Sequence, residues 1–174
     1  MDYKQELTQA MTAMGRDPRT RFIGYGVSIG KAMGTLKEIN DTQLIEMPVA
    51  ENLMVSFGIG LSLKGLLPVV FIERFDFILN AMDAIVNHLD KIAVASEGEF
   101  RPAMILRIVV GNRKKPLFTG ATHTQDLSRM LQKAVTFPVI QLHTPAQIKP
   151  VYETSFDAMK MGISSALVEF KDQI

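Results

Sequence analysis

The chain has 174 residues, and its 19 lysines and arginines against 18 aspartates and glutamates give a formal net charge of +1. This balance offers no basic field for nucleic acid or for an anionic membrane surface. The longest apolar run, 66–72, is far too short to span a bilayer. Cysteine is absent, which excludes disulfides, thiolate catalysis and zinc–sulfur sites and fits a cytoplasmic protein. The length predicts one domain over 1–174 with a sizeable core.

Hydrophobic periodicity and turn residues divide the chain into alternating helices and strands. In chain order, the predicted elements are helix 3–14, strand 21–25, a glycine-rich connection to Gly34, strand 43–46, helix 51–64, strand 67–73, helix 76–95, strand 103–110, helix 125–134, strand 138–142, a helix within 146–161 that should start or kink at Pro150, and strand 165–170. No hairpin signal interrupts the alternation. The pattern therefore predicts an α/β fold with a doubly wound, mostly parallel sheet of about six strands and helices on both faces.

A single carboxylate, Glu51, opens the predicted helix 51–64, and no charged side chain follows it from Asn52 to Leu63. Burial in such apolar surroundings favours the neutral form of a carboxylate, which would let Glu51 exchange a proton near neutral pH. Ser56, Gly58 and nearby small residues keep this helix thin enough for a backbone or a flat ligand to approach. The alternative is a structural role for Glu51 at the positive end of the helix dipole.

Polar groups follow three of the predicted strands directly. Glu51 comes after the second strand, residues 73–77 after the third, and the segment 121–126 with His123 after the fourth. Ligands of open parallel sheets bind at the carboxyl ends of the strands. We therefore expect a carboxylate, an aromatic pair and a histidine to converge at one edge of the sheet.

Other motifs are incomplete. The segment from Gly26 to Lys31 is one residue too short for a phosphate-binding loop, and Ala32 stands where a hydroxyl should hold magnesium. No dinucleotide fingerprint is present. The histidines lie at scattered positions that do not match metal-ligand spacing, so the sequence predicts no metal ligand in this chain.

Residues 43–87 resemble the pyrimidine-binding domain of thiamine diphosphate-dependent enzymes, without a gap from the strand through the glycine-containing helix to the Phe-x-Phe turn and the next helix. Within this transketolase-like family the resemblance is closest to the β subunit of the decarboxylating component of 2-oxoacid dehydrogenases. The segment ATHTQD (121–126) is similar to the family's His-Ser-Gln loop. Residues 16–27 and 143–148 are weaker matches.

The resemblance implies a role for each candidate residue. Glu51 would hydrogen-bond N1′ of the cofactor's aminopyrimidine and so promote loss of the C2 proton of the thiazolium. Phe77 would pack on the pyrimidine ring with Phe75 as its support, Glu73 would belong to the same cofactor-facing turn, and His123 would face the substrate and assist acyl or proton transfer. The alternatives are ordinary core packing for the two phenylalanines and a surface position for the histidine.

The family holds the diphosphate and Mg²⁺ on a separate domain that carries a Gly-Asp-Gly…Asn segment, and residues 1–174 contain neither this segment nor the family's C-terminal domain. The resemblance therefore implies one subunit of a split enzyme. Its partner would be a diphosphate-binding-domain subunit that holds Mg²⁺, in an α2β2 heterotetramer, and its substrate a small carbonyl compound such as a 2-oxoacid.

Two other functions stay open. One is transketolase-like or acyloin-forming carbon–carbon transfer, and the other is a non-catalytic assembly or ligand-sensing domain. Two departures from the family bear on substrate and site coupling: Tyr25 stands where the family usually has an acidic residue, and Lys114 and Lys115 lie in an expanded loop before His123.

Overall fold

The fold is built on one parallel six-stranded sheet with the strand order β2-β1-β3-β4-β6-β5. The computed structural model describes residues 1–117 and 120–174. The strands are β1 Thr20–Gly24, β2 Leu44–Glu46, β3 Leu67–Ile72, β4 Ile105–Val110, β5 Val139–Gln141 and β6 Ser165–Phe170. The α-helical segments are α1 Tyr3–Gly15, α2 Lys31–Gly34, α3 Glu51–Leu63, α4 Ile92–Ala95, α5 Ser128–Ala134 and α6 Pro145–Lys160. The predicted fold class is confirmed.

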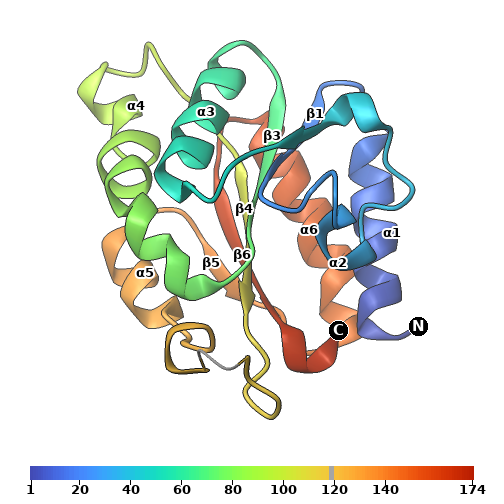
Figure 1. Cartoon of the computed structure of the whole chain (residues 1–174). Helices are drawn as coiled ribbons and strands as arrows, with labels where there is room; N and C mark the ends of the chain where they lie inside the picture. The colour runs from blue at the N-terminus through green and yellow to red at the C-terminus, as the bar shows by residue number, and fades with distance from the viewer. Residues whose placement is uncertain (118–119) are drawn as a thin grey trace.

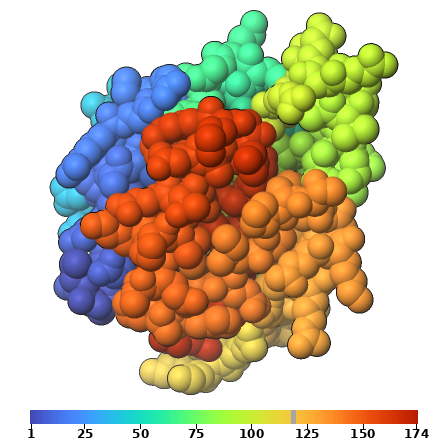
Figure 2. Space-filling view, turned by 180° about the vertical axis from the view of Figure 1, so that it is seen from behind, coloured from blue at the N-terminus to red at the C-terminus, as the bar shows by residue number. Residues whose placement is uncertain are grey.

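Helices cover both faces of the sheet. Figure 1 shows α1 and α6 on one side and α3, α4 and α5 on the other. Seen from behind, α6 covers the middle of the surface and is flanked by the N-terminal segment (Figure 2). Strands β3 and β4 are buried at every residue, as expected for central strands covered on both faces, and their residues are apolar except for Arg107 in β4.

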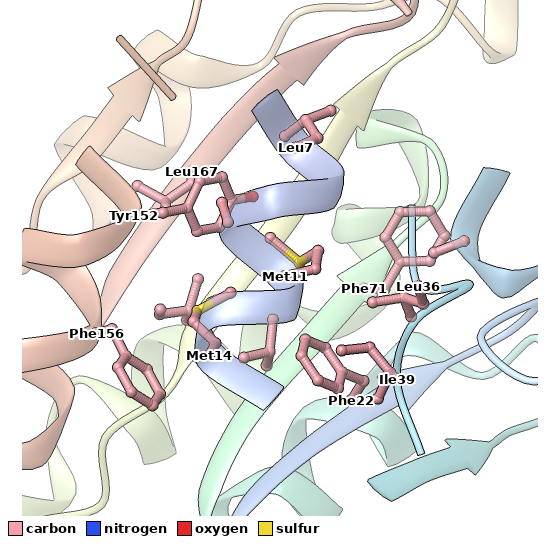
Figure 3. Packing of buried hydrophobic residues seen from close by; sticks show 14 of the residues in the cluster. Leu7, Met11, Met14, Phe22, Leu36, Ile39, Phe71, Tyr152, Phe156 and Leu167 are labelled. Carbon is pink, nitrogen blue, oxygen red and sulfur yellow. The ribbon is translucent and has the colours of Figure 1, made fainter. Parts of the chain in front are cut away.

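Each face of the sheet has its own hydrophobic core. In the first, Leu7, Met11 and Met14 of α1 pack among side chains of α6 and the sheet, including Phe22 and Phe156 (Figure 3). In the second, residues of α3 and of the segment 75–89 cover the other face. Gly58 brings α3 close to the sheet, because a Cβ there would lie 3.0 Å from Val70 Cγ2. The absence of a side chain at Gly58 therefore allows α3 to pack closely on the sheet of this chain, and not on a ligand.

Helix α6 begins at Pro145 and runs through Pro150, so the expected start at Pro150 is wrong. Thr144 and Gln147 form a capping box at the N-terminus. Proline suits the first helical position because no N–H partner is needed there. Pro150 lies on the exposed side, where water can satisfy the carbonyl that its missing N–H leaves free.

The single helix predicted over 76–95 is instead three segments. They are a 3₁₀-helix η2 at Phe75–Ala81, a π-helix η3 at Ala84–Leu89 and the short α4. Buried residues recur every third position at Phe75, Ile78, Ala81 and Ala84, and this spacing suits the three residues per turn of a 3₁₀-helix. The apolar stripe correctly indicated burial, but it did not distinguish among the three helix types.

The predicted start of the helix at 125 is also wrong, since α5 begins at Ser128. The Asp126 carboxylate accepts hydrogen bonds from the backbone N–H and the hydroxyl of Ser128, at 3.0 and 2.5 Å. A side chain that bonds local backbone in this way favours a turn over a helix.

Within the described residues, no helix is long and apolar enough to cross a bilayer.

Candidate functional site

The site lies at the topological switch point of the sheet, between β1 and β3, where successive strands are added on opposite sides of β1. The chain passes from β1 outward to β2 and then returns to β3 on the other side of β1, which makes a crevice at the carboxyl ends of these strands. A pocket of about 190 Å³ opens there. Its lining residues are Tyr25, Val49, Glu51, Met54, Phe71, Glu73 and Phe77.

Glu51 is the first residue of α3, and only 4 % of its surface is exposed. Met54 and Phe71, both nearly fully buried, line the same pocket. Among the described residues, none is hydrogen-bonded or ion-paired to the Glu51 carboxylate. The carboxylate therefore lies in an apolar wall with its bonding capacity available to the pocket, and it makes no capping bond to the backbone of α3.

The turn after β3 supplies two further lining residues, Glu73 and Phe77. Oε1 of Glu73 lies 3.0 Å from Nη1 of the buried Arg74, so the orientation of the Glu73 carboxylate is fixed. Phe77 is half-buried at the pocket, whereas Phe75 is fully buried in the core beneath it and does not line the pocket. For Phe75, a supporting role stays a prediction.

His123 reaches the same place from the loop after β4. Its ring meets the ring of Phe77 edge-on, with centroids 5.2 Å apart and planes at 86°. Nδ1 of His123 lies 3.0 Å from Oγ1 of Thr122. Glu51, Glu73 and Phe77 thus line one pocket, and His123 contacts Phe77 without lining that pocket itself. Lys114 and Lys115 are exposed and do not line it either. Residues 118 and 119 of this loop lie outside the described part of the chain.

Asp76 is a buried residue that the sequence analysis did not single out. It is 7 % exposed, and its Oδ1 accepts a hydrogen bond from Nε2 of Gln125 at 2.8 Å. Its Oδ2 is buried and has no hydrogen-bond partner among the described residues. The bond to Gln125 ties the loop of His123 to the turn of Phe77. A carboxylate between two aromatic residues in an apolar stretch is the sequence signal that could have found it.

A second pocket of about 290 Å³ adjoins the first and shares Tyr25, Phe71 and Glu73 with it. Its other lining residues are Gly26, Ile29, Gly30, Ala32, Met33 and Glu46. Both oxygens of the Glu46 carboxylate accept backbone N–H groups, including that of Ser28 at 2.7 Å. Tyr25, 47 % exposed, stands between the two pockets.

Two larger grooves lie elsewhere on the described part of the chain, one of about 760 Å³ along α1 and α6 and one of about 610 Å³ beside α1. Neither contains any of the candidate residues. In the part of the chain that the structure describes, no three His, Asp or Glu side chains gather to hold a metal ion.

The residues of the first pocket fit one half of a heteroaromatic cofactor. Among the described residues none pairs with the Glu51 carboxylate, which therefore matches a ring nitrogen that shares a proton, and the half-buried Phe77 offers a face on which a flat ring can pack. Among the residues that line the two pockets, none is a lysine or arginine that could bind a diphosphate.

Comparison with known proteins agrees with this arrangement. The family model described as the transketolase pyrimidine-binding domain matches residues 1–168. The chain is 28 % identical over 147 residues to the pyruvate dehydrogenase E1 component subunit beta of Staurastrum punctulatum, covering 82 % of this chain and 44 % of that protein. It is also 28 % identical over 134 residues to the mitochondrial subunit of Saccharomyces cerevisiae, covering 74 % and 36 %.

A split-gene transketolase, solved as an inactive beta4 tetramer, has a similar fold with a TM-score of 0.73 at 14 % identity, covering 100 % of this chain and 53 % of that one. The chain spans less than half the length of the two curated relatives. Since the family model covers nearly the whole chain, the chain belongs to the family of the transketolase pyrimidine-binding domain.

Proposed function

We propose that this chain supplies the aminopyrimidine half of a thiamine diphosphate site in a two-subunit enzyme. The observation that carries the proposal is the Glu51 carboxylate, 4 % exposed and facing a pocket walled by aromatic side chains. Bound thiamine diphosphate supplies an electron sink for breaking or forming a bond next to a carbonyl group. Glu51 would hold a proton at N1′, Phe77 would pack on the ring, and Glu73, which lines the same pocket, would face the cofactor.

His123 has a separate role in this proposal. The contact of its ring with Phe77, a residue that lines the pocket, supports a role in binding the substrate or transferring a proton. The substrate class is a 2-oxoacid, which is decarboxylated or passes on its acyl group. Transketolase-like or acyloin-forming transfer is the alternative within enzymes, and it is supported by the fold of the split-gene transketolase.

In this proposal a partner chain supplies the diphosphate half of the site. We infer a diphosphate-binding subunit that holds the diphosphate and Mg²⁺, an α2β2 assembly and a cytoplasmic location. The relatives named as beta subunits support a partner chain. So do three exposed apolar side chains near Glu51 in the sequence: Val49, just before α3, and Leu53 and Phe57 on α3, which are 40–61 % exposed. Such exposed apolar side chains are typical of a covered interface.

The test is exchange of the C2 proton of thiamine diphosphate, measured by NMR after this chain is mixed with the companion subunit and Mg²⁺. Glu51→Gln keeps the shape of the side chain but cannot hold the carboxylate's proton, and it should slow the exchange by about 10²-fold or more. The folded state should persist by circular dichroism. Near-normal exchange in Glu51→Gln would remove Glu51 from the mechanism, and a non-catalytic domain would leave the exchange rate at that of free thiamine diphosphate with wild-type protein.

A further inference from the structure

A left-handed helical turn forms part of the second pocket. Lys31, Ala32 and Met33 in α2 have φ values of 45°, 44° and 60°. Three consecutive residues with a Cβ in this region are sterically unfavourable, and such a backbone persists only when its surroundings hold it. Side chains around the turn must therefore stabilise its backbone.

Thr35 connects the turn to a buried ion pair. Its fully buried hydroxyl donates a hydrogen bond to the carbonyl of Ala32 at 2.8 Å and accepts one from Nη1 of Arg107 at 2.8 Å. Both bonding directions of the hydroxyl are therefore used. The side chain of Thr35 therefore links the guanidinium of Arg107, in the middle of the sheet, to the carbonyl of Ala32 in the left-handed turn.

Arg107 itself has a fixed orientation. Its guanidinium is 1 % exposed, and Nε and Nη2 donate to the two oxygens of Glu169 at 2.8 and 2.9 Å. The hydroxyl of Tyr152 donates to the same carboxylate. A two-point bond of this kind allows a guanidinium little rotation, so its third nitrogen points steadily at Thr35.

The same guanidinium also touches the wall shared by the two pockets. Cζ of Arg107 lies 5.1 Å from the ring centroid of Phe71, which lines both pockets. Ala32 and Met33 of the turn line the second pocket. One buried group therefore sets the position of the turn and of the aromatic side chain next to Glu51.

We propose that Thr35 is a positioning residue, which transmits the fixed geometry of the Arg107–Glu169 pair to the left-handed turn and so keeps the pocket beside Glu51 in its binding shape. The second half of this statement rests on the proposed function. The first half is a property of the isolated chain and can be tested without any cofactor.

The first test compares amide hydrogen exchange in three variants of the isolated chain. Thr35→Val removes the hydroxyl at nearly constant volume, and Thr35→Ser keeps it. Thr20→Val is the matched control, because Thr20 is equally buried and its hydroxyl donates to the carbonyl of Met14, away from the turn.

Exchange should rise about 10-fold or more in Thr35→Val at the amides of the turn and stay within about 3-fold of wild type in the other two. The amides to follow are those of Ala32, Gly34 and Leu36, which donate to the carbonyls of Gly26, Gly30 and Lys31 and so depend on the backbone position of the turn. Unchanged exchange in Thr35→Val overturns the proposal.

Arg107→Lys provides a second route if Thr35→Val does not fold. A lysine ammonium keeps the charge but cannot bind Glu169 and Thr35 with the same fork, so exchange in the turn should rise in the same way. Protection equal to wild type in this variant also contradicts the proposal.

The second test uses the assembled enzyme with thiamine diphosphate. Thr35→Val should raise the KM for the cofactor about 10-fold while kcat at saturation stays within about 2-fold, and Thr20→Val should change neither. A loosened turn with unchanged KM overturns the positioning role in cofactor binding. If wild-type enzyme shows no C2-proton exchange, the proposed function fails, and the amide data still decide whether Thr35 holds the turn.

Discussion

The ring of His123 stands edge-on to the ring of Phe77, with centroids 5.2 Å apart and an angle of 86° between their planes. The two residues come from loops that follow different strands, β4 and β3. Edge-to-face contacts of aromatic rings are favourable, so this contact joins a titratable imidazole to the wall of the pocket that contains Glu51.

Gly111 controls the backbone position of His123. A Cβ on Gly111 would lie 1.8 Å from the carbonyl oxygen of His123, so Gly111→Ala must displace that loop. We expect the His123 ring to lose the ring-current shift caused by Phe77 in NMR spectra. The kcat of the assembled enzyme should fall about 10²-fold, because misplacing a catalytic group by about 1 Å has effects of this size.

Gly60→Ala is the control for the isolated chain. No heavy atom lies within 4 Å of a Cβ at this helical position. The substitution should stabilise the chain by about 0.5–1 kcal/mol and leave the His123 resonances unchanged. Unshifted His123 resonances in Gly111→Ala would show that the loop adapts without moving the imidazole.

The stability of the fold should be little changed by an amide side chain at position 76 but reduced by truncation of this side chain. Asp76→Asn keeps an acceptor for Gln125 and removes a buried charge, so the free energy of unfolding should stay within about 1 kcal/mol of wild type. Asp76→Ala leaves the Gln125 amide without its partner and should cost about 1–3 kcal/mol. Urea unfolding measures both.

The control Asp157→Ala, on the exposed surface, should change stability by about 0.5 kcal/mol or less. A larger loss in Asp76→Asn than in Asp76→Ala would contradict the assigned hydrogen bond.

Asp90 makes stability depend on pH. Burial raises the pKa of its carboxyl, but hydrogen bonds from Lys91 and from the hydroxyl and N–H of Thr136 outweigh burial and hold the pKa below the usual 3.8. A carboxylate with a lowered pKa stabilises the fold above its unfolded-state pKa, and this contribution is lost as the pH falls through the folded-state pKa.

Asp90→Asn should therefore cost about 1–2 kcal/mol at pH 7, and its difference from wild type should shrink as the pH falls below about 4. Urea unfolding at a series of pH values measures this, with Asp157→Asn as the control that leaves the profile unchanged. A constant difference across the acid range would exclude Asp90 as the titrating group.

Much of the fold could be predicted because buried strands and helix faces have recognisable patterns of apolar residues along the sequence. The apolar run at 67–72 and the segment 103–110, which is apolar except for Arg107, mark β3 and β4, and every residue of these two strands is buried. The position of the site followed from the same reasoning, since Glu51 and His123 each come after a strand of a parallel sheet.

Periodicity indicates which side chains are buried, not how the backbone turns between them. For this reason the stripe over 76–95 predicted one helix where the chain forms 3₁₀, π and α segments. The left-handed turn at Lys31, Ala32 and Met33 could not be predicted either, because these residue types do not favour positive φ and only their surroundings keep them there.

By itself, the sequence determined the alternation of strands and helices, the family and the carboxylate at the start of α3, since each depends on residues close together in the chain. The tertiary structure alone decided the pairing of Arg107 with Glu169, which are 62 residues apart, and the contact of His123 with Phe77. Such pairs form only when the sheet brings distant strands together, and no local pattern encodes the partner of a buried charge.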